Sequence, residues 1–275
     1  MLVVDGCFIL EFFRGSVLGF TEIGYAPNDP VFVMRGLMHS IKRDMIMLEN
    51  QLPMFVLSRL LELQIGTQNQ TGVVAQLPIQ FFNPLMPTRE TLTRSESSLD
   101  WQEESVEQQA YNGELHSLHV FHGSLIQSSR TQQDMSMVDK REQQPVHCVT
   151  ELRQAGIGFM RKKTGQLWDI EFGNGYLRIP KLLIHEGTKS LFSNLTTLEQ
   201  CHIHSSKKIT SYIIFMDNLI NSPEGVSYLH HYGIIEHWLG SDSEVADLFN
   251  GLCKDVVFNL KDSYLSLIYH GFYGF

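Results

Sequence analysis

None of the cysteines in this sequence belongs to a CxxC pair, and their spacing suggests no disulfide framework. The residues concerned are Cys7, Cys148, Cys201 and Cys253. We therefore expect reduced, buried thiols in an intracellular protein. A secretory signal peptide is also lacking, because the first residues carry Asp5 and Glu11 and no basic segment.

The sequence also lacks an excess of positive charge and any long apolar run. With 21 Lys and Arg against 30 Asp and Glu, its formal net charge is −9. Nucleic acid is therefore a poor partner, since phosphate binding needs a basic surface. The apolar runs fall well short of the ~20 residues that span a bilayer. We predict no nucleic-acid partner and a cytoplasmic or peripheral location.

Signatures of catalysis are missing as well. The sequence contains no G-x-S-x-G elbow, no phosphate-binding loop and no dinucleotide fingerprint. Gly173-Asn174-Gly175 lacks the third glycine and the following helix of such a fingerprint, and it is typical of a hairpin turn. We expect no catalytic residue, no bound metal and no cofactor.

Among the features that are present, the most informative is the stretch 44–63, whose apolar residues recur at helical spacing. The polar residues Glu49, Asn50 and Gln51 interrupt it just before Pro53. Proline kinks a continuous helix, but it fits the first position of a new one. The pattern allows a kinked helix or two helices, and it favours two helices joined near Pro53. Asn50 or Gln51 would then bond backbone groups that the helix ends leave unpaired.

The remaining patterns predict a mainly α protein with a small antiparallel β-meander (α+β). We expect helices at 2–13, 31–50 with a break near Gly36, 53–65, 116–126, 150–155, 188–201, 209–220, 225–232 and 241–258. Segments 157–162, 167–172 and 176–179 read as the strands of the meander. Residues 88–145 are rich in Gln, Ser, Glu and Thr, so they predict a mobile insert within a single domain spanning 1–275.

The twelve histidines suggest a metal site, but their spacing does not favour one. His116, His119 and His122 recur every three residues, which spreads them over more than about 100° of a helix. They would converge poorly on one ion. His202 and His204 form a dense cluster with Cys201, but no carboxylate stands at a partner spacing. Surface or partly buried histidines are the better interpretation of both sets.

Three carboxylates also have a structural and a catalytic interpretation. Asp169 and Glu171 alternate onto one face of a predicted strand, where they could do acid–base work. Without a visible partner, a solvated strand face is the better interpretation. For Asp217, likewise, an exposed helix face is favoured over a catalytic acid.

The motifs together resemble a plant family catalogued as domain of unknown function 247. The strings that carry the resemblance include Asp5-Gly6-Cys7-Phe8-Ile9-Leu10-Glu11, Leu48-Glu49-Asn50-Gln51-Leu52-Pro53, Trp168-Asp169-Ile170-Glu171-Phe172 and Phe215-Met216-Asp217-Asn218-Leu219-Ile220-Asn221. Their order and spacing agree over about 1–66 and 115–265. We assign structural roles to the motif residues Asp5, Gly6, Glu49, Asn50, Gln51, Pro53, Asp169, Phe215, Met216 and Asp217.

The resemblance implies further properties that the residues do not show by themselves. Family members carry a leading segment before the first helix and a C-terminal transmembrane helix, which implies attachment to the plasma membrane. Compared with them, this chain looks truncated at both ends. No enzymatic activity or cofactor is established for the family. Some grass members resemble determinants of pollen self-incompatibility, which implies recognition or signalling.

The leading hypothesis is a non-enzymatic interaction or signalling protein, in which residues 88–145 recognise an unknown protein partner. A first alternative is a hydrolase or metal-dependent enzyme that uses Asp169, Glu171, His202 and His204. A second alternative is a degenerate fragment without a stable function, because loss of a leading segment would expose apolar surface on the first helix.

Overall fold

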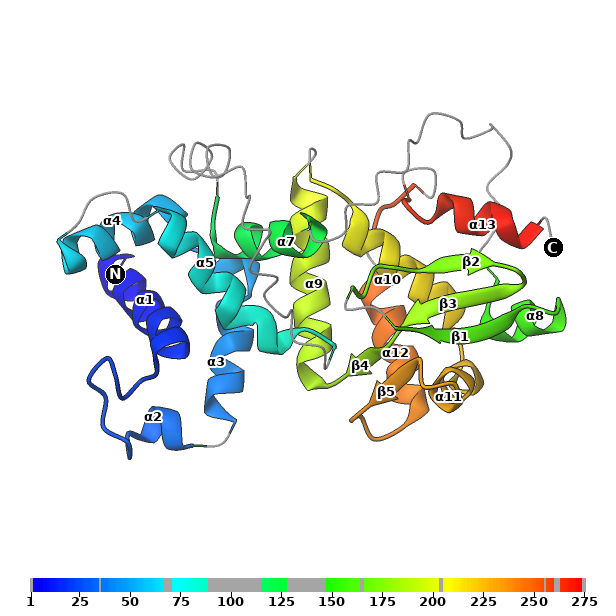
Figure 1. Ribbon diagram of the computed structural model, residues 1–275, viewed down its shortest axis with the longest axis horizontal. Coiled ribbons are helices and arrows are strands. Elements are labelled where there is room, and N and C mark those ends of the chain that lie inside the picture. Colours follow the sequence, from blue (N-terminus) through cyan, green and yellow to red (C-terminus); the bar gives the residue numbers. More distant parts are fainter. Residues whose placement is uncertain are drawn as a thin grey trace. The chain divides into compact units, whose positions relative to one another are not determined.

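The computed structural model describes residues 2–34, 36–66, 71–88, 115–127, 147–163, 166–202, 205–254, 256–259 and 263–273. The chain divides into two compact units, one made of Met1–Met86 and Thr91–Leu125 and the other of Pro87–Glu90 and Ile126–Phe275. Figure 1 labels the elements of both units. The predicted class, mainly helical with a small amount of sheet, is confirmed.

The first unit is built from helices. They are α1 (Leu2–Leu18), α2 (Pro30–Val33), α3 (Leu37–Met45), the 3-10 turn η1 (Leu48–Asn50), α4 (Met54–Ile65), α5 (Thr71–Phe82), the 3-10 turn η2 (Asn83–Leu85) and α7 (Ser117–Gln127). Helices α1, α4 and α5 pack against one another. Phenylalanines dominate this core: Phe13 lies 5.0 Å from Phe81, and Phe82 lies 5.5 Å from Phe121, measured between ring centroids.

Helix α1 differs from its prediction in length and in burial. It continues through Gly15 to Leu18, five residues beyond the predicted end at Phe13. A Cβ atom at Gly15 would lie 2.2 Å from the ring of Phe20. The helix was expected to be packed on several sides. Only one face is buried, the face of Leu10 and Phe13. Val4 on the opposite face is 70% exposed.

The breaks between the next helices lie close to their predicted positions. Gly36 has φ +89° and separates α2 from α3, while Gly66 has φ +78° and ends α4. Both conformations are open to glycine at little cost. Pro53 occupies the N-cap of α4 with φ −59°, one position before the predicted one. The two-helix interpretation of this stretch is therefore correct.

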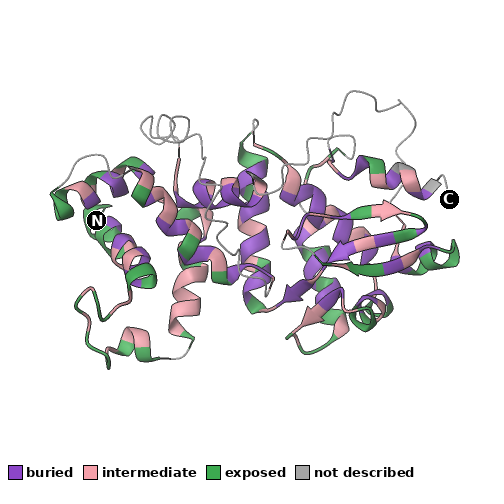
Figure 2. Ribbon diagram, viewed as in Figure 1, coloured by how far each residue is buried: buried purple, intermediate pink, exposed green. Residues whose placement is uncertain are grey.

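The second unit combines helices with two small sheets. Its elements are α8 (Val149–Gln154), β1 (Gly158–Lys162), β2 (Glu171–Gly173), β3 (Tyr176–Pro180), β4 (Leu182–Ile184), α9 (Glu186–Cys201), α10 (Lys208–Leu219), α11 (Pro223–His231), β5 (Ile235–His237), α12 (Asp242–Cys253) and α13 (Ser266–Tyr273). Helices α9, α10 and α12 pack together, and Figure 2 shows buried residues concentrated along α9. Helix α12 ends five residues before its predicted end at Phe258.

The strands pair differently from the predicted meander. Strands β2 and β3 do form an antiparallel hairpin across Gly173-Asn174-Gly175, with Asn174 at φ +54°. Strand β1, however, pairs parallel with β3, so the order is β1-β3-β2 and the antiparallel prediction is wrong for β1. A second sheet, in which β4 and β5 pair in parallel, was not predicted.

Only part of the segment 88–145 falls within the described residues. Helix α7 appears as predicted, with Leu118 and Phe121 fully buried. Most of the segment expected to be mobile lies outside the described residues. Within the described parts of the chain, no helix combines the length and apolar character needed to cross a bilayer.

Candidate functional site

The polar residues of the Leu48–Pro53 string bond the backbone around the junction between α3 and α4. Gln51 Nε2 donates to the carbonyl of Met45 at 2.8 Å and to that of Met47 at 2.9 Å. Asn50 Nδ2 donates to the carbonyl of Asp44 at 2.8 Å. These carbonyls belong to the last turn of α3 and the residues after it, where no further helical turn supplies the i+4 N–H donor.

The same glutamine also fixes the helix that lies within segment 88–145. The backbone N–H of Leu118, in the first turn of α7, donates to Gln51 Oε1 at 3.0 Å. Beside it, Met54 N donates to the carbonyl of Leu115 at 2.8 Å. The Gln51 side chain therefore joins the end of α3 to the start of α7, and the Met54–Leu115 bond joins the start of α4 to the residues before α7.

The first motif string places its glycine where two helices cross. A Cβ atom at Gly6 would lie 2.4 Å from Leu60 Cδ1 of α4, so a larger residue here would require the Leu60 side chain to move. Asp5 is exposed in the first turn of α1, where a carboxylate interacts favourably with the helix dipole. Glu49 is exposed in η1.

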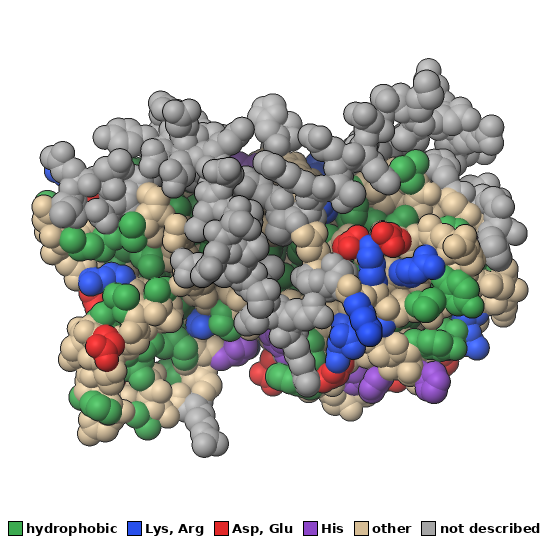
Figure 3. All heavy atoms as spheres, viewed as in Figure 1, with side chains coloured by type: hydrophobic (Ala, Val, Ile, Leu, Met, Phe, Trp, Pro, Cys, Tyr) green, Lys and Arg blue, Asp and Glu red, His purple; other side chains and the backbone are tan. Residues whose placement is uncertain are grey.

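Asp169 and Glu171 are brought together by a lysine. Lys162 Nζ of β1 lies 2.7 Å from Asp169 Oδ1 and 2.8 Å from Glu171 Oε1. Partial burial lowers the pKa of Lys162, but the two carboxylates raise it, and the pKa ends above its ordinary value. Figure 3 shows acidic and basic side chains side by side on this unit. Both carboxylates are therefore engaged by the same ammonium group.

The histidines proposed for the alternative enzyme do not join this pair in a described site. His202 is the exposed C-cap residue of α9, and His204 lies outside the described residues. His116 directly precedes α7, and its ring centroid lies 3.9 Å from that of His119 in the helix, where His122 is buried. Within the described residues, none of these histidines belongs to a group of three metal-ligating side chains.

The Phe215–Asn221 string contributes apolar side chains to the core and one partly buried carboxyl group. Phe215 and Met216 of α10 are fully buried. Asp217 is only partly buried and lies against Cys253 of α12, not on a fully exposed helix face. Burial raises the pKa of the Asp217 carboxyl. Burial also raises the pKa of the Cys253 thiol to about 12, with Asp217 adding to the effect, so this thiol is a poor nucleophile at neutral pH.

Glu199 is an important carboxylate that the sequence did not single out. It lies in α9 with 1% of its surface exposed. Its carboxylate accepts from Ile209 N at 3.1 Å, from Thr210 N at 2.8 Å and from Thr210 Oγ1 at 2.6 Å. It thus caps the N-terminus of α10 from a neighbouring helix. Capping from a distant segment leaves no local spacing signal.

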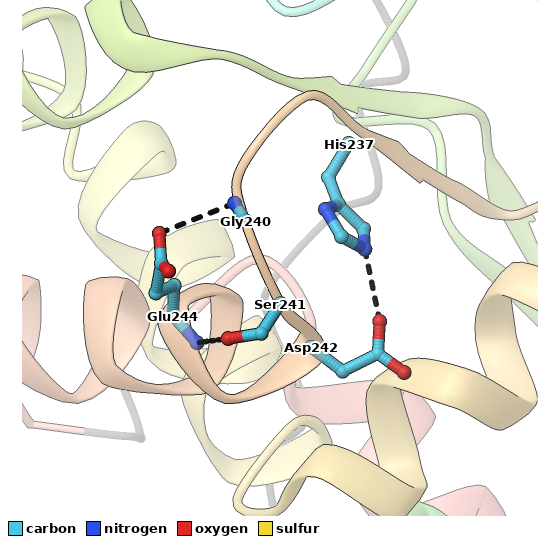
Figure 4. Close-up of polar contacts among 5 residues, drawn as sticks. All are labelled: His237, Gly240, Ser241, Asp242 and Glu244. Atoms are coloured by element: carbon cyan, nitrogen blue, oxygen red, sulfur yellow. Dashed lines mark hydrogen bonds and ion pairs between the residues drawn. The ribbon is translucent and has the colours of Figure 1, made fainter.

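One cluster in the second unit does bring metal-ligating side chains together. Among the described residues, a single group of three His, Cys, Asp or Glu side chains has its donor atoms within 4.8 Å of one another, namely His230, His237 and Asp242. His237 Nε2 and Asp242 Oδ1 lie 2.9 Å apart, as Figure 4 shows. The rings of His230 and His237 have centroids 5.8 Å apart. Sequence reasoning missed this cluster, since its spacing matches no ligand motif.

Backbone contacts set the position of each of the three residues. His230 lies in the last turn of α11, where its carbonyl accepts from Gly233 N at 2.8 Å. His237 ends β5 in register with Ile184 of β4. Asp242 is the first residue of α12, directly after the N-cap Ser241.

Comparison with known proteins gives a family and no activity. Residues 1–272 match the model of DUF247, described as "Plant protein of unknown function". The chain is 31% identical over 282 residues to the UPF0481 protein At3g47200 of Arabidopsis thaliana, across 98% of this chain and 57% of that relative. It is 26% identical over 117 residues to the putative UPF0481 protein At3g02645 of the same plant, across 42% of this chain and 22% of that relative.

The chain therefore spans a little over half the length of the first of these relatives. No solved structure matches it.

Proposed function

The chain belongs to the plant protein family DUF247, and on that basis we propose that it is a non-enzymatic interaction or signalling protein. In this proposal, residues 88–145 recognise a protein partner and the two compact units serve as the scaffold, here called the frame. Recognition residues often lie on segments held by a rigid scaffold.

The attachment of α7 supports this proposal most directly. Helix α7 lies in the middle of segment 88–145, and its Leu118 and Phe121 are fully buried. Gln51 accepts a hydrogen bond from its first turn while holding the end of α3. The segment is therefore tied to the frame at its centre, and residues 89–114 and 128–146 flank this fixed point.

The state of the polar motif residues also favours binding over catalysis. Gln51 and Asn50 bond backbone carbonyls, and Lys162 pairs with both Asp169 and Glu171. These bonds give each polar motif residue a structural role that needs no substrate. The motif residues thus serve the frame.

A capture experiment tests the role of the segment without removing α7 from the core. Residues 89–114 and 128–146 are replaced by Gly/Ser sequences of equal length, and the tagged chain is incubated with plant cytosolic and membrane fractions. We expect the replacement to abolish capture of the partner that the unaltered chain retains. A matched control carries the natural residues of both stretches in shuffled order, which keeps their composition and charge.

Circular dichroism melts of all three proteins show whether the frame is intact. If the replaced chain melts normally and captures the same partners as the unaltered chain, residues 88–145 do not carry recognition. Capture that survives shuffling but not replacement would indicate that charge and composition are sufficient.

A further inference from the structure

We propose that His230, His237 and Asp242 form a binding site for a divalent transition metal ion such as Zn²⁺. Each residue contributes one donor atom to the ion. The site does not depend on segment 88–145 or on the proposed role of that segment.

The donor chemistry fits this class of ion. Two imidazole nitrogens and one carboxylate oxygen form a ligand set that zinc accepts, whereas magnesium and calcium prefer oxygen donors. Three protein ligands leave a fourth position of a tetrahedral ion for water or for a group from another molecule. Among the described residues, no other group of three side chains offers such a set.

The distances are compatible with an ion after small side-chain rotations. Zinc lies about 2.0–2.1 Å from its ligands, so tetrahedral donors stand about 3.3 Å apart. The 2.9 Å between His237 Nε2 and Asp242 Oδ1 would lengthen by about 0.4 Å to reach that separation. The remaining donors, within 4.8 Å, would move closer. His230 is exposed and Asp242 is partly exposed, so both side chains can rotate without disturbing the core.

Hydrogen bonds around His237 and Asp242 hold the backbone of both residues in place before any ion binds. Trp238 N donates to the carbonyl of Ile184 at 2.9 Å and so continues the β4–β5 pairing beyond His237. At the start of α12, Glu244 N donates to Ser241 Oγ at 3.3 Å, and Gly240 N donates to Glu244 Oε2 at 3.3 Å. Figure 4 shows how these contacts fix the turn that carries Asp242 opposite His237. Ligands on capped helix ends and paired strands form a preorganised site.

A simple hydrogen bond between His237 and Asp242 does not account for the whole arrangement. The side chain of His237 is only 11% exposed, and the ring of His230 lies beside it, with centroids 5.8 Å apart. The bond to Asp242 leaves this approach of a second imidazole unexplained, whereas an ion engages all three residues.

Metal titration of the full chain tests the site. The protein is prepared without a histidine tag, stripped with a chelator and titrated with Zn²⁺ in a calorimeter and with Co²⁺ in a spectrophotometer. We expect one Zn²⁺ per chain at the tightest site and the strong visible absorption of low-coordinate Co²⁺. His230→Ala and Asp242→Asn should each weaken that binding at least about tenfold, since loss of even an indirect partner of a metal ligand costs about 10- to 100-fold.

The next residue along α11 provides a matched control. His231 is exposed and lies outside the cluster, so His231→Ala removes one histidine without removing a ligand. It should bind Zn²⁺ as the unaltered chain does, and Zn²⁺ should raise the melting temperature of both. His230→Ala alters an exposed side chain, and its melt without metal shows whether it folds.

Equal Zn²⁺ affinity in the unaltered chain, His230→Ala and Asp242→Asn would overturn the proposal. So would the absence of a tight one-to-one binding step.

Discussion

Replacing Gln51 with alanine should loosen α7 from the frame of the first unit. The substitution removes the donor to Met45 and Met47 and the acceptor for Leu118 N. Because Leu118 is fully buried, its N–H would have no water to replace the lost acceptor. The two carbonyls are nearer to solvent and lose less.

The magnitude follows from these three groups. A buried donor left without a partner costs about 1–3 kcal/mol, and each solvated carbonyl loses about 0.5 kcal/mol of net hydrogen-bond free energy. The sum is about 2–4 kcal/mol against the local opening of α7. Since 1.4 kcal/mol corresponds to a factor of ten, amide exchange should accelerate by about 25- to 700-fold.

Hydrogen exchange read by mass spectrometry on peptides that cover α7 measures this change. Gln51→Glu separates the two halves of the site, because it keeps an acceptor for Leu118 N and loses the donor. It should accelerate exchange of the α7 amides less than Gln51→Ala does. The control is Gln64→Ala, which removes only the exposed bond from Gln64 Nε2 to Glu11 at 3.1 Å and should change stability by less than about 0.5 kcal/mol.

Unchanged exchange of the α7 peptides in Gln51→Ala would refute this reasoning. It would mean that packing of the buried apolar residues of α7 alone holds the helix, and that the Gln51 amide is replaceable by water.

Three further substitutions test the second unit. Glu199→Gln keeps the shape of the buried cap but not its charge, and it should destabilise the protein by about 2–4 kcal/mol in denaturant unfolding, since bonds to charged groups are the stronger ones. Lys162→Met should cost less than about 1 kcal/mol, because its partners are partly exposed. The folded-state pKa of Lys162 is raised, so its contribution to stability is complete below the ordinary lysine pKa and is lost as the pH rises through the raised value. In thermal melts from neutral to strongly alkaline pH, the melting temperatures of the variant and the unaltered chain should therefore converge. Asp217→Asn should raise the melting temperature at neutral pH, because burial raises the Asp217 pKa and the charged form opposes folding. The gain should vanish in melts below the ordinary aspartate pKa of about 3.9. A lower melting temperature of the variant at neutral pH would contradict this prediction.

The parts of the fold that could be predicted are those encoded within a few residues. Pro53 cannot continue a helix, and the polar residues before it have few roles other than bonding the exposed backbone. Gly66 ends α4 and Gly173-Asn174-Gly175 turns the β2–β3 hairpin, in both cases through positive φ angles. Each of these helix ends and turns depends on the steric properties of one to three residues, so it can be predicted from those residues alone.

The pairing of strands could not be predicted in the same way. The sequence of β1 indicates a strand but does not say which strand lies beside it, or in which direction. The parallel pairs β1–β3 and β4–β5 bring together segments joined by other elements of structure. The burial of α1 was overestimated for a related reason, because an apolar sequence does not reveal how much of its surface neighbouring helices cover.

The histidines show the same difference between residues that are close in the sequence and residues that the fold brings together. The sequence drew attention to His116, His119 and His122 because they are close together along the chain, yet one helix spreads such residues around its surface. His230, His237 and Asp242 stand on α11, β5 and α12, and they meet because the β4–β5 pairing places the end of β5 beside two helix ends. A ligand motif is visible in a sequence only when one element carries most of the ligands. A site assembled from the ends of three elements has to be found in the structure. His230 is exposed and Asp242 is partly exposed, so substitutions at these two positions test metal binding with little effect on folding.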